Sequence, residues 1–139
     1  MQLSDIMTAN PVVLGPDTVL REAAQKMREL DSGVMPVGEN DRLVGMLTDR
    51  DITVRATADG KDPNTTPVRD VMSSEVIYCF ADDDVEVAAR KMEEHQIRRV
   101  IVLDRDKRLV GIASLGDLAV HAPTDRLAGE VTEAVSEPT

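Results

Sequence analysis

Two pairs of side chains in this sequence have types and spacing that suit a phosphorylated, sugar-bearing ligand. Thr48 precedes Asp51 by three residues, and Ser114 precedes Asp117 by the same interval. In each pair the hydroxyl falls where a helix is expected to begin, beside backbone N–H groups that favour a phosphate. The carboxylate falls on the same side of that first turn and has enough acceptor sites for two vicinal hydroxyls.

The same spacing also fits a simpler role. A hydroxyl followed three residues later by a carboxylate matches the pattern of a capping box, in which the two side chains only close the start of a helix. Both roles can coexist in one pair, so the sequence leaves this alternative open.

The two pairs recur because the chain repeats itself. Displaced by about 65 positions, Asp5 falls on Asp70 and Met7 on Met72. After one extra residue in the second copy, Leu43 to Gly45 fall on Leu109 to Gly111. The two halves are therefore one unit used twice. We expect a first repeat over 4–58, a linker rich in Gly, Asn and Pro over 59–68, a second repeat over 69–120 and an acidic tail over 121–139.

Each unit is expected to follow the order β-α-β-β-α, which predicts an α+β fold. Strands are predicted at residues 12–14, 34–37 and 43–47, and again at 76–80, 100–103 and 109–112. A second helix is expected from about Asp49 to Ala58, with its counterpart starting near Leu115. The first helix of each repeat carries an apolar stripe at helical spacing: Leu20, Ala23, Ala24, Met27 and Leu30 in one copy, and Val85, Ala88, Ala89 and Met92 in the other.

The ends of the first helices are predicted from their capping residues. Thr18 and Asp83 stand at equivalent positions and are good N-caps. Gly33 is expected to end the first helix in a left-handed conformation.

Composition excludes several classes of protein. Hydrophobic residues make up 42% of the chain, with one Tyr, one Phe and no Trp, so the core must be aliphatic. A net charge of −10 argues against binding to duplex nucleic acid or to an anionic membrane surface. No apolar run is long enough to span a membrane, and the first residues do not resemble a signal peptide.

The single cysteine, Cys79, excludes an intrachain disulfide and fits a cytoplasmic protein. It lies in an apolar run, which favours a small buried side chain over a reactive thiol. His95 and His121 have no second His or Cys at metal-binding spacing, so no metal site is predicted. No nucleophile elbow, P-loop, dinucleotide fingerprint or HExxH pattern appears, so we expect no catalytic residues and no enzymatic activity.

The order Asp-Ile-Met, strand, helix with paired alanines, strand pair and then Gly-Met-Leu-Thr-Asp-Arg-Asp resembles the CBS domain (the cystathionine-β-synthase-type repeat) over residues 4–120. Residues 45–52 and 92–100 are most similar to short stand-alone CBS pairs of the mycobacterial hypoxic response protein type. The resemblance implies two small sheets packed face to face with helices outside, and a homodimer formed through those helices. It also implies clefts between the repeats that bind AMP, ADP, ATP, NAD or S-adenosylmethionine as regulatory ligands.

The ligand motif of that family is Gly, hydrophobic, any residue, Thr or Ser, two residues, then Asp. Both copies are complete, at residues 45–51 and 111–117. We expect the glycines to allow close approach of the ligand, the hydroxyls to hold phosphate and the carboxylates to hold ribose: Gly45, Thr48 and Asp51 in the first copy, and Gly111, Ser114 and Asp117 in the second.

By the family pattern, an apolar slot for adenine lies between the first strand and the start of the second. Ordinary core packing is the alternative for each of its residues. The predicted slot residues are Val12, Val13, Met35 and Pro36 in the first repeat, and Ile77, Tyr78, Val100 and Ile101 in the second.

Basic residues are expected to make the two clefts unequal. Arg98 and Arg99 precede the second strand of repeat two, where the family often places a basic residue near the phosphates, whereas repeat one has Gly33 and Val34. Such a guanidinium pair favours di- or triphosphates. Nearby acidic residues could instead pair with these arginines at the surface. Arg50 adds a positive charge to the first motif.

The sequence therefore predicts a non-catalytic sensor module that needs no cofactor and binds an adenosyl ligand, with AMP and ATP as the first candidates. The alternative is a dimeric scaffold with empty clefts that acts in a stress response. The sequence does not identify the ligand, the protein partner or the arrangement of the dimer.

Overall fold

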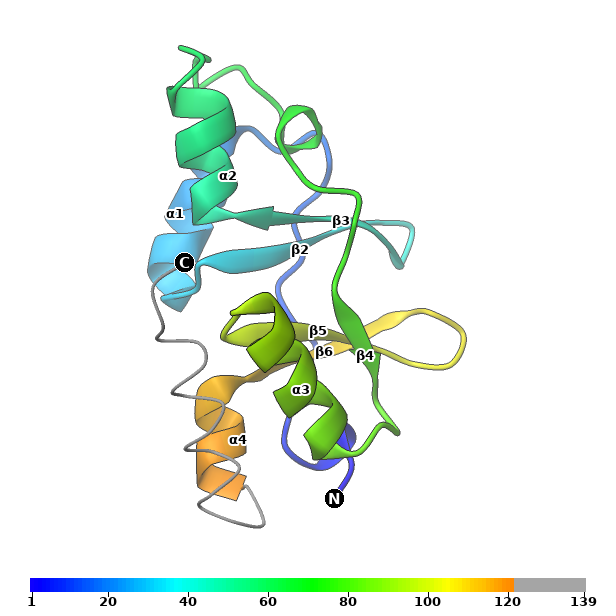
Figure 1. Ribbon diagram of the computed structural model, residues 1–139. Coiled ribbons are helices and arrows are strands. Elements are labelled where there is room, and N and C mark those ends of the chain that lie inside the picture. Colours follow the sequence, from blue (N-terminus) through cyan, green and yellow to red (C-terminus); the bar gives the residue numbers. More distant parts are fainter. Residues whose placement is uncertain (122–139) are drawn as a thin grey trace. The chain divides into compact units, whose positions relative to one another are not determined.

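The computed structural model describes residues 1–121, so the expected acidic tail lies outside the described residues apart from His121. The chain forms two compact units, which are described separately below (Figure 1). One unit is Val12–Val76, and the other combines Met1–Pro11 with the described residues from Ile77 to His121. The division does not follow the sequence repeats, because the first eleven residues belong with the second repeat.

The unit Val12–Val76 is built on a two-stranded antiparallel sheet, β2 with β3. Asn40 and Asp41 join the strands with φ angles of 54° and 63°, the left-handed conformation that a tight hairpin turn requires. The elements are α1 (Leu20–Leu30), β2 (Val34–Glu39), β3 (Arg42–Thr48), α2 (Asp49–Asp51), a π-helix η2 (Ile52–Thr57) and a 3-10 helix η3 (Val68–Asp70).

The second unit is built on a four-stranded sheet in the order β1-β6-β5-β4. β4 pairs with β5 in parallel, and the other two pairings are antiparallel. Its elements are a 3-10 helix η1 (Leu3–Asp5), β1 (Thr8–Ala9), β4 (Tyr78–Phe80), α3 (Val85–His95), β5 (Arg99–Leu103), β6 (Leu109–Ser114) and α4 (Leu115–His121). Two small sheets with four α-helices among the described residues confirm the predicted α+β class.

The first predicted strand, residues 12–14, is wrong. Only Leu14 pairs, in an isolated parallel bridge to Val37, which is the counterpart of the pair Cys79–Val102 in β4 and β5. The Gly15-Pro16 sequence ends the pairing, because Pro16 has no N–H to donate. Val12 and Val13 are consequently more than two-fifths exposed.

The predicted helix caps are also displaced. α1 begins after Val19, which makes no side-chain cap, and α3 begins after Asp84, whose carboxylate accepts a hydrogen bond from the Glu86 N–H. Asp83 instead accepts from the N–H of Phe80 and closes the preceding turn. α1 ends at Asp31 with a φ of 49° rather than at Gly33.

Each unit has its own aliphatic core. Met27 and Met92 both lie in these cores, as their stripes predicted. Ala24 and Leu30 of the first stripe are exposed, however, so the buried face of α1 is narrower than the sequence predicts. Over residues 1–121, no helix has the length and apolar character needed to cross a bilayer.

A reciprocal exchange of segments completes the two units. The first residues of repeat one pair with β6 of repeat two, with Thr8 opposite Ile112. The first residues of repeat two likewise pair with β3 of repeat one, with Ser73 opposite Met46. We call residues 3–9 and 68–73 the exchanged segments.

Glycines in β3 and β6 make room for the exchanged segments. A β-carbon on Gly45 would lie 2.6 Å from the sulfur of Met72 and 3.0 Å from the carbonyl oxygen of Ser73. A β-carbon on Gly111 would lie 2.9 Å from Cγ of Met7 and 3.0 Å from the carbonyl oxygen of Thr8. Packing against the exchanged segments is thus sufficient to require glycine at both positions.

We therefore predict that Gly45→Ala and Gly111→Ala each lower the free energy of unfolding by about 1–3 kcal/mol, because an added methyl group overpacks the contact. Gly116→Ala in α4 is a matched control, since a β-carbon there would lie 3.6 Å from the nearest atom, Ser114 Oγ. It should leave stability unchanged or raise it by up to about 1 kcal/mol. Urea unfolding followed by circular dichroism measures all three, and an unchanged midpoint for Gly45→Ala would contradict the packing account.

Burial accounts for the chemistry of Cys79. The side chain is 1% exposed in the core of its unit. Desolvation raises the pKa of the thiol to about 11, although Lys91 partly opposes the shift. At pH 8 about one thiol in a thousand is then ionised. We predict that Ellman's reagent labels the native protein very slowly and the urea-unfolded protein at the rate of a free cysteine; equal rates would disprove the burial.

Candidate functional site

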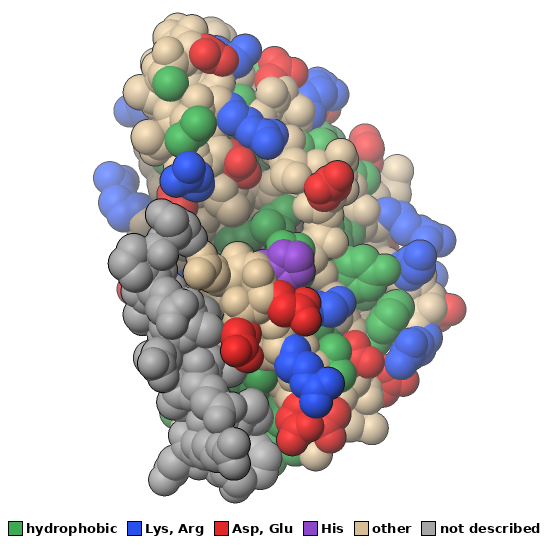
Figure 2. All heavy atoms as spheres, in the orientation of Figure 1, with side chains coloured by type: hydrophobic (Ala, Val, Ile, Leu, Met, Phe, Trp, Pro, Cys, Tyr) green, Lys and Arg blue, Asp and Glu red, His purple; other side chains and the backbone are tan. Residues whose placement is uncertain are grey.

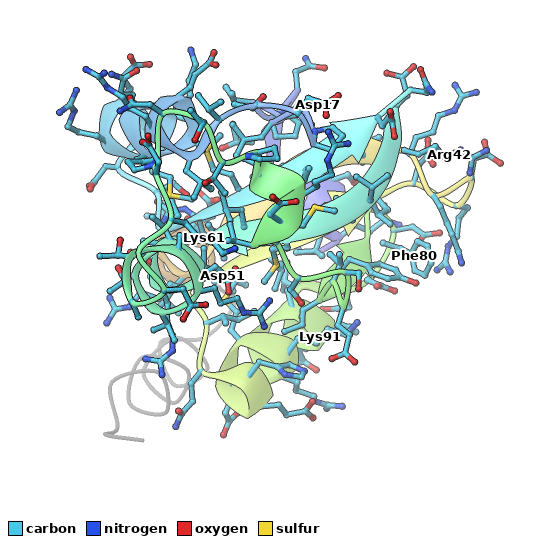
Figure 3. All side chains as sticks on the ribbon, turned by 90° about the horizontal axis from the view of Figure 1, so that it is seen from above. Asp17, Arg42, Asp51, Lys61, Phe80 and Lys91 are labelled. Atoms are coloured by element: carbon cyan, nitrogen blue, oxygen red, sulfur yellow. The ribbon has the colours of Figure 1, made fainter. Side chains whose placement is uncertain are left out.

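The first hydroxyl–carboxylate pair lies at the junction of β3 and α2. Thr48 ends the strand, and its Oγ1 accepts a hydrogen bond from the backbone N–H of Asp51 at 3.0 Å. Asp51 Oδ2 accepts from the N–H of Thr48, also at 3.0 Å. Both side chains are half-buried, and Asp51 is labelled in Figure 3. These two bonds form a complete capping box.

The second pair repeats this geometry at the junction of β6 and α4. The N–H of Asp117 donates to Ser114 Oγ at 3.0 Å, and the N–H of Ser114 donates to Asp117 Oδ2 at 2.9 Å. The capping role considered from the sequence is therefore present in both repeats. It engages one oxygen of each carboxylate through these bonds, and a carboxylate oxygen can accept more than one hydrogen bond.

Arg99 lies beside the second pair. Its Cα partner across the β5–β6 ladder is Ser114, so the two side chains stand on the same face of the sheet. In the first unit the partner of Thr48 is Val34. The ladder thus places an arginine opposite Ser114 and a valine opposite Thr48.

Arg98 and Arg50 are both exposed. The carbonyl oxygen of Arg98 accepts from the N–H of Leu115 at 2.7 Å, which links the start of β5 to the start of α4. The N–H of Arg50 donates to Asp49 Oδ1 at 2.8 Å.

The predicted adenine-slot residues form three sets that differ in burial and in position along the strands. Met35 and Val100 are 1% exposed and belong to the cores of their own units, so core packing explains them. Pro36 and Ile101 are buried but alternate with those core residues along their strands. The remaining four are accessible or partly so: Val12, Val13, Ile77 and Tyr78.

Arg55 is a contact of the first pair that the sequence reasoning missed. Its Nε lies 3.8 Å from Asp51 Oδ1, and its Nη1 donates to the carbonyl oxygens of Val71 and Met72 at 3.5 Å. The i,i+4 spacing from Asp51 was the available signal. Arg55 ties the carboxylate of the motif to an exchanged segment.

The chain's two aromatic rings lie together on the edge strand β4. Tyr78 and Phe80 meet edge to face with 5.6 Å between ring centroids. Lys91 of α3 lies 5.5 Å from the Tyr78 centroid, and Arg105 lies 4.2 Å from the Phe80 centroid. Phe80 and Lys91 are labelled in Figure 3. The side-chain hydrogen bond from Arg105 holds the pKa of Asp82 below its usual value.

Acidic and basic side chains are interspersed on the face shown in Figure 2 rather than gathered by sign. Among residues 1–121, no group of three or more His, Cys, Asp and Glu side chains could hold a metal ion. The side chain of His121 lies outside this description.

Two curated proteins resemble the chain over most of its length. The CBS domain-containing protein YhcV of Bacillus subtilis is 41% identical over 134 residues, which cover 96% of this chain and 94% of that protein. Hypoxic response protein 1 of Mycobacterium tuberculosis is 44% identical over 120 residues, covering 86% and 83%.

Three solved structures of CBS-type proteins are also similar to this chain. Hypoxic Response Protein I, described with two coordinated zinc ions, matches with a TM-score of 0.80 and 43% identity over 88% of this chain and all of that one. The CBS domain protein PAE2072 from Pyrobaculum aerophilum, complexed with AMP, gives 0.78 and 29% over 96% and 99%. The CBS domain pair of MJ0100, in complex with 5'-methylthioadenosine and S-adenosyl-L-methionine, gives 0.74 and 27% over 86% and 94%.

A family model for the CBS domain matches residues 3–56 and again residues 68–122. Each match contains one of the two hydroxyl–carboxylate pairs. The chain therefore belongs to the CBS-domain family and carries two CBS domains in tandem.

Proposed function

We propose that this CBS pair is a non-catalytic, cytoplasmic regulatory module that binds an adenosyl ligand at its two hydroxyl–carboxylate pairs. The observation that carries the proposal is the complete motif in both repeats with matching local geometry: Thr48 with Asp51, and Ser114 with Asp117. We take residues 4–58 and 69–120 as the two ligand-binding repeats. The expected assembly is a homodimer through the helices.

Ligand chemistry supports the proposal. Each carboxylate can accept the two vicinal hydroxyls of a ribose, and each hydroxyl can donate to a phosphate oxygen. Arg99 adds a charge-assisted donor beside Ser114. AMP is named with one structurally similar CBS protein, and 5'-methylthioadenosine and S-adenosyl-L-methionine are named with another. AMP and ATP are the first ligands to test, with ADP, NAD and S-adenosylmethionine beside them.

One observation favours the alternative, a dimeric scaffold without a ligand. Within each pair, each side chain already accepts a capping hydrogen bond from the backbone N–H of the other residue. Under that alternative the pairs would serve only to start helices, and their loss would change stability without changing any ligand affinity.

We predict that a true ligand at 100 times its dissociation constant stabilises the protein by about 2.7 kcal/mol, measured by thermal unfolding. Asp51→Ala and Asp117→Ala should each remove one site from the stoichiometry measured by calorimetry. Asp59→Ala, at an exposed position outside both motifs, is the control and should bind as the wild type does.

Circular dichroism of each variant separates a lost site from a lost fold. If none of the five ligands at millimolar concentration raises the melting temperature, the module binds no adenosyl ligand and the scaffold account remains.

A further inference from the structure

The Asp51 carboxylate has one oxygen that caps the helix and one that faces a side chain. Oδ2 accepts the capping hydrogen bond from the N–H of Thr48 at 3.0 Å. Oδ1 lies 3.8 Å from Nε of Arg55, in the π-helix η2 that continues α2. That separation is too long for a hydrogen bond, so the two side chains form an ion pair that leaves Oδ1 able to accept from a hydroxyl group.

Arg55 also contacts the exchanged segment 68–73. Its Nη1 donates to the carbonyl oxygens of Val71 and Met72, both at 3.5 Å. These two residues pack into the unit, since Val71 is buried in the core and the sulfur of Met72 lies against Gly45. One guanidinium group therefore joins the motif carboxylate to the packed part of the exchanged segment.

This link is loose enough for another donor to replace it. All three distances exceed the roughly 3.2 Å that is the usual upper limit for N–H···O hydrogen bonds. The Arg55 side chain is 55% exposed and the Asp51 side chain 16% exposed. An exposed ion pair contributes little, and its arginine can turn into water while the half-buried carboxylate stays in place. A new donor at Oδ1 would therefore displace the guanidinium group.

An arginine at this position belongs to the first repeat alone. Aligning the two copies on Asp51 and Asp117 places His121 where the first repeat has Arg55. The local helix differs as well, because η2 is a π-helix whereas α4 is an α-helix. Single π-helical turns are frequent at functional sites. The first motif thus has a feature that the ligand motif shared by both repeats does not explain.

We propose that Arg55 couples the first motif to the exchanged segment 68–73, so that ligand binding at Asp51 loosens that segment. A ribose hydroxyl that donates to Asp51 Oδ1 at about 2.7–2.8 Å takes the place of the ion pair. The guanidinium group then turns to solvent, and its hydrogen bonds to Val71 and Met72 are lost. This inference rests on the proposed function, since it needs an adenosyl ligand at Asp51, and it names the structural response to that ligand.

Amide hydrogen exchange in the full chain measures the coupling. Adenosine is the probe, because it has the ribose hydroxyls but no phosphate to attract Arg55. The N–H groups of Met72 and Ser73 report on the segment, since both donate to backbone carbonyl oxygens. In the Asp117→Ala background, saturating adenosine should speed exchange at both amides about two- to fivefold, the range for an exposed ion pair. The amides of α1, in the same unit, should not exchange faster.

Arg55→Met in that background removes the guanidinium group and keeps an unbranched side chain. Because the link is then already broken, exchange at Met72 and Ser73 should be faster without a ligand and should not respond to adenosine. By reciprocity, calorimetry should show that adenosine binds the first motif about two- to fivefold more tightly. Arg28→Met, at an exposed position of α1, is the matched control and should change neither property.

The results that would overturn the inference differ from those that would overturn the proposed function. If adenosine binds the first motif but leaves exchange at Met72 and Ser73 unchanged or slows it, or if Arg55→Met does not raise the affinity, the coupling fails and the proposed function stands. If adenosine does not bind the Asp117→Ala variant, the coupling also fails, because ribose hydroxyls alone should displace Arg55. If none of the five adenosyl ligands binds the wild type, the proposed function fails as well.

Discussion

Each unit of this protein is completed by a segment from the start of the other repeat. The contact depends on two glycines, Gly45 and Gly111, which leave room for a methionine and a backbone carbonyl group from the exchanged segment. Because the segments cross in both directions, neither sequence repeat contains all the residues of its own unit. This constraint explains why the duplicated sequence produces a discontinuous unit together with a continuous one.

The same strands carry the packing contact and the candidate binding motif. Gly45 and Thr48 are three residues apart on β3, and Gly111 and Ser114 are three residues apart on β6. Arg55 adds a second link in the first unit, since it contacts both Asp51 and the carbonyl oxygens of the exchanged segment. A ligand that draws on the Asp51 carboxylate would compete with that link, and under the proposed function its binding would then be coupled to the packing of the exchanged segment.

The features that could be predicted from sequence are those that follow from periodicity and duplication. The repeat, the hairpins and the stripe around Met92 depend on local pattern, and the inequality introduced by Arg99 follows from aligning the two copies. The strand at residues 12–14 could not be excluded, because this apolar run aligns with Ile77 to Cys79, which lead into and form part of β4 in the second repeat, and only the following Gly15-Pro16 limits its pairing.

Other features depend on contacts between distant parts of the chain. The sequence predicts that Gly45 and Gly111 allow close approach of a ligand, and the structure adds a packing role for both, since Met72 and Met7 lie against them. The helix caps were placed one residue early at both Thr18 and Asp83, because a turn and a cap compete for neighbouring residues of similar type. Tertiary contacts of this kind are not visible in a single sequence.

The central claim is that the hydroxyl–carboxylate pairs bind an adenosyl ligand as well as capping their helices. A crystal structure of the chain grown with AMP tests it most directly. The account predicts ribose hydroxyls within hydrogen-bonding distance of the Asp117 carboxylate, with the phosphate beside Ser114 and Arg99. AMP bound away from both motifs, or crystals from saturating AMP with density for it at neither motif, would contradict the claim.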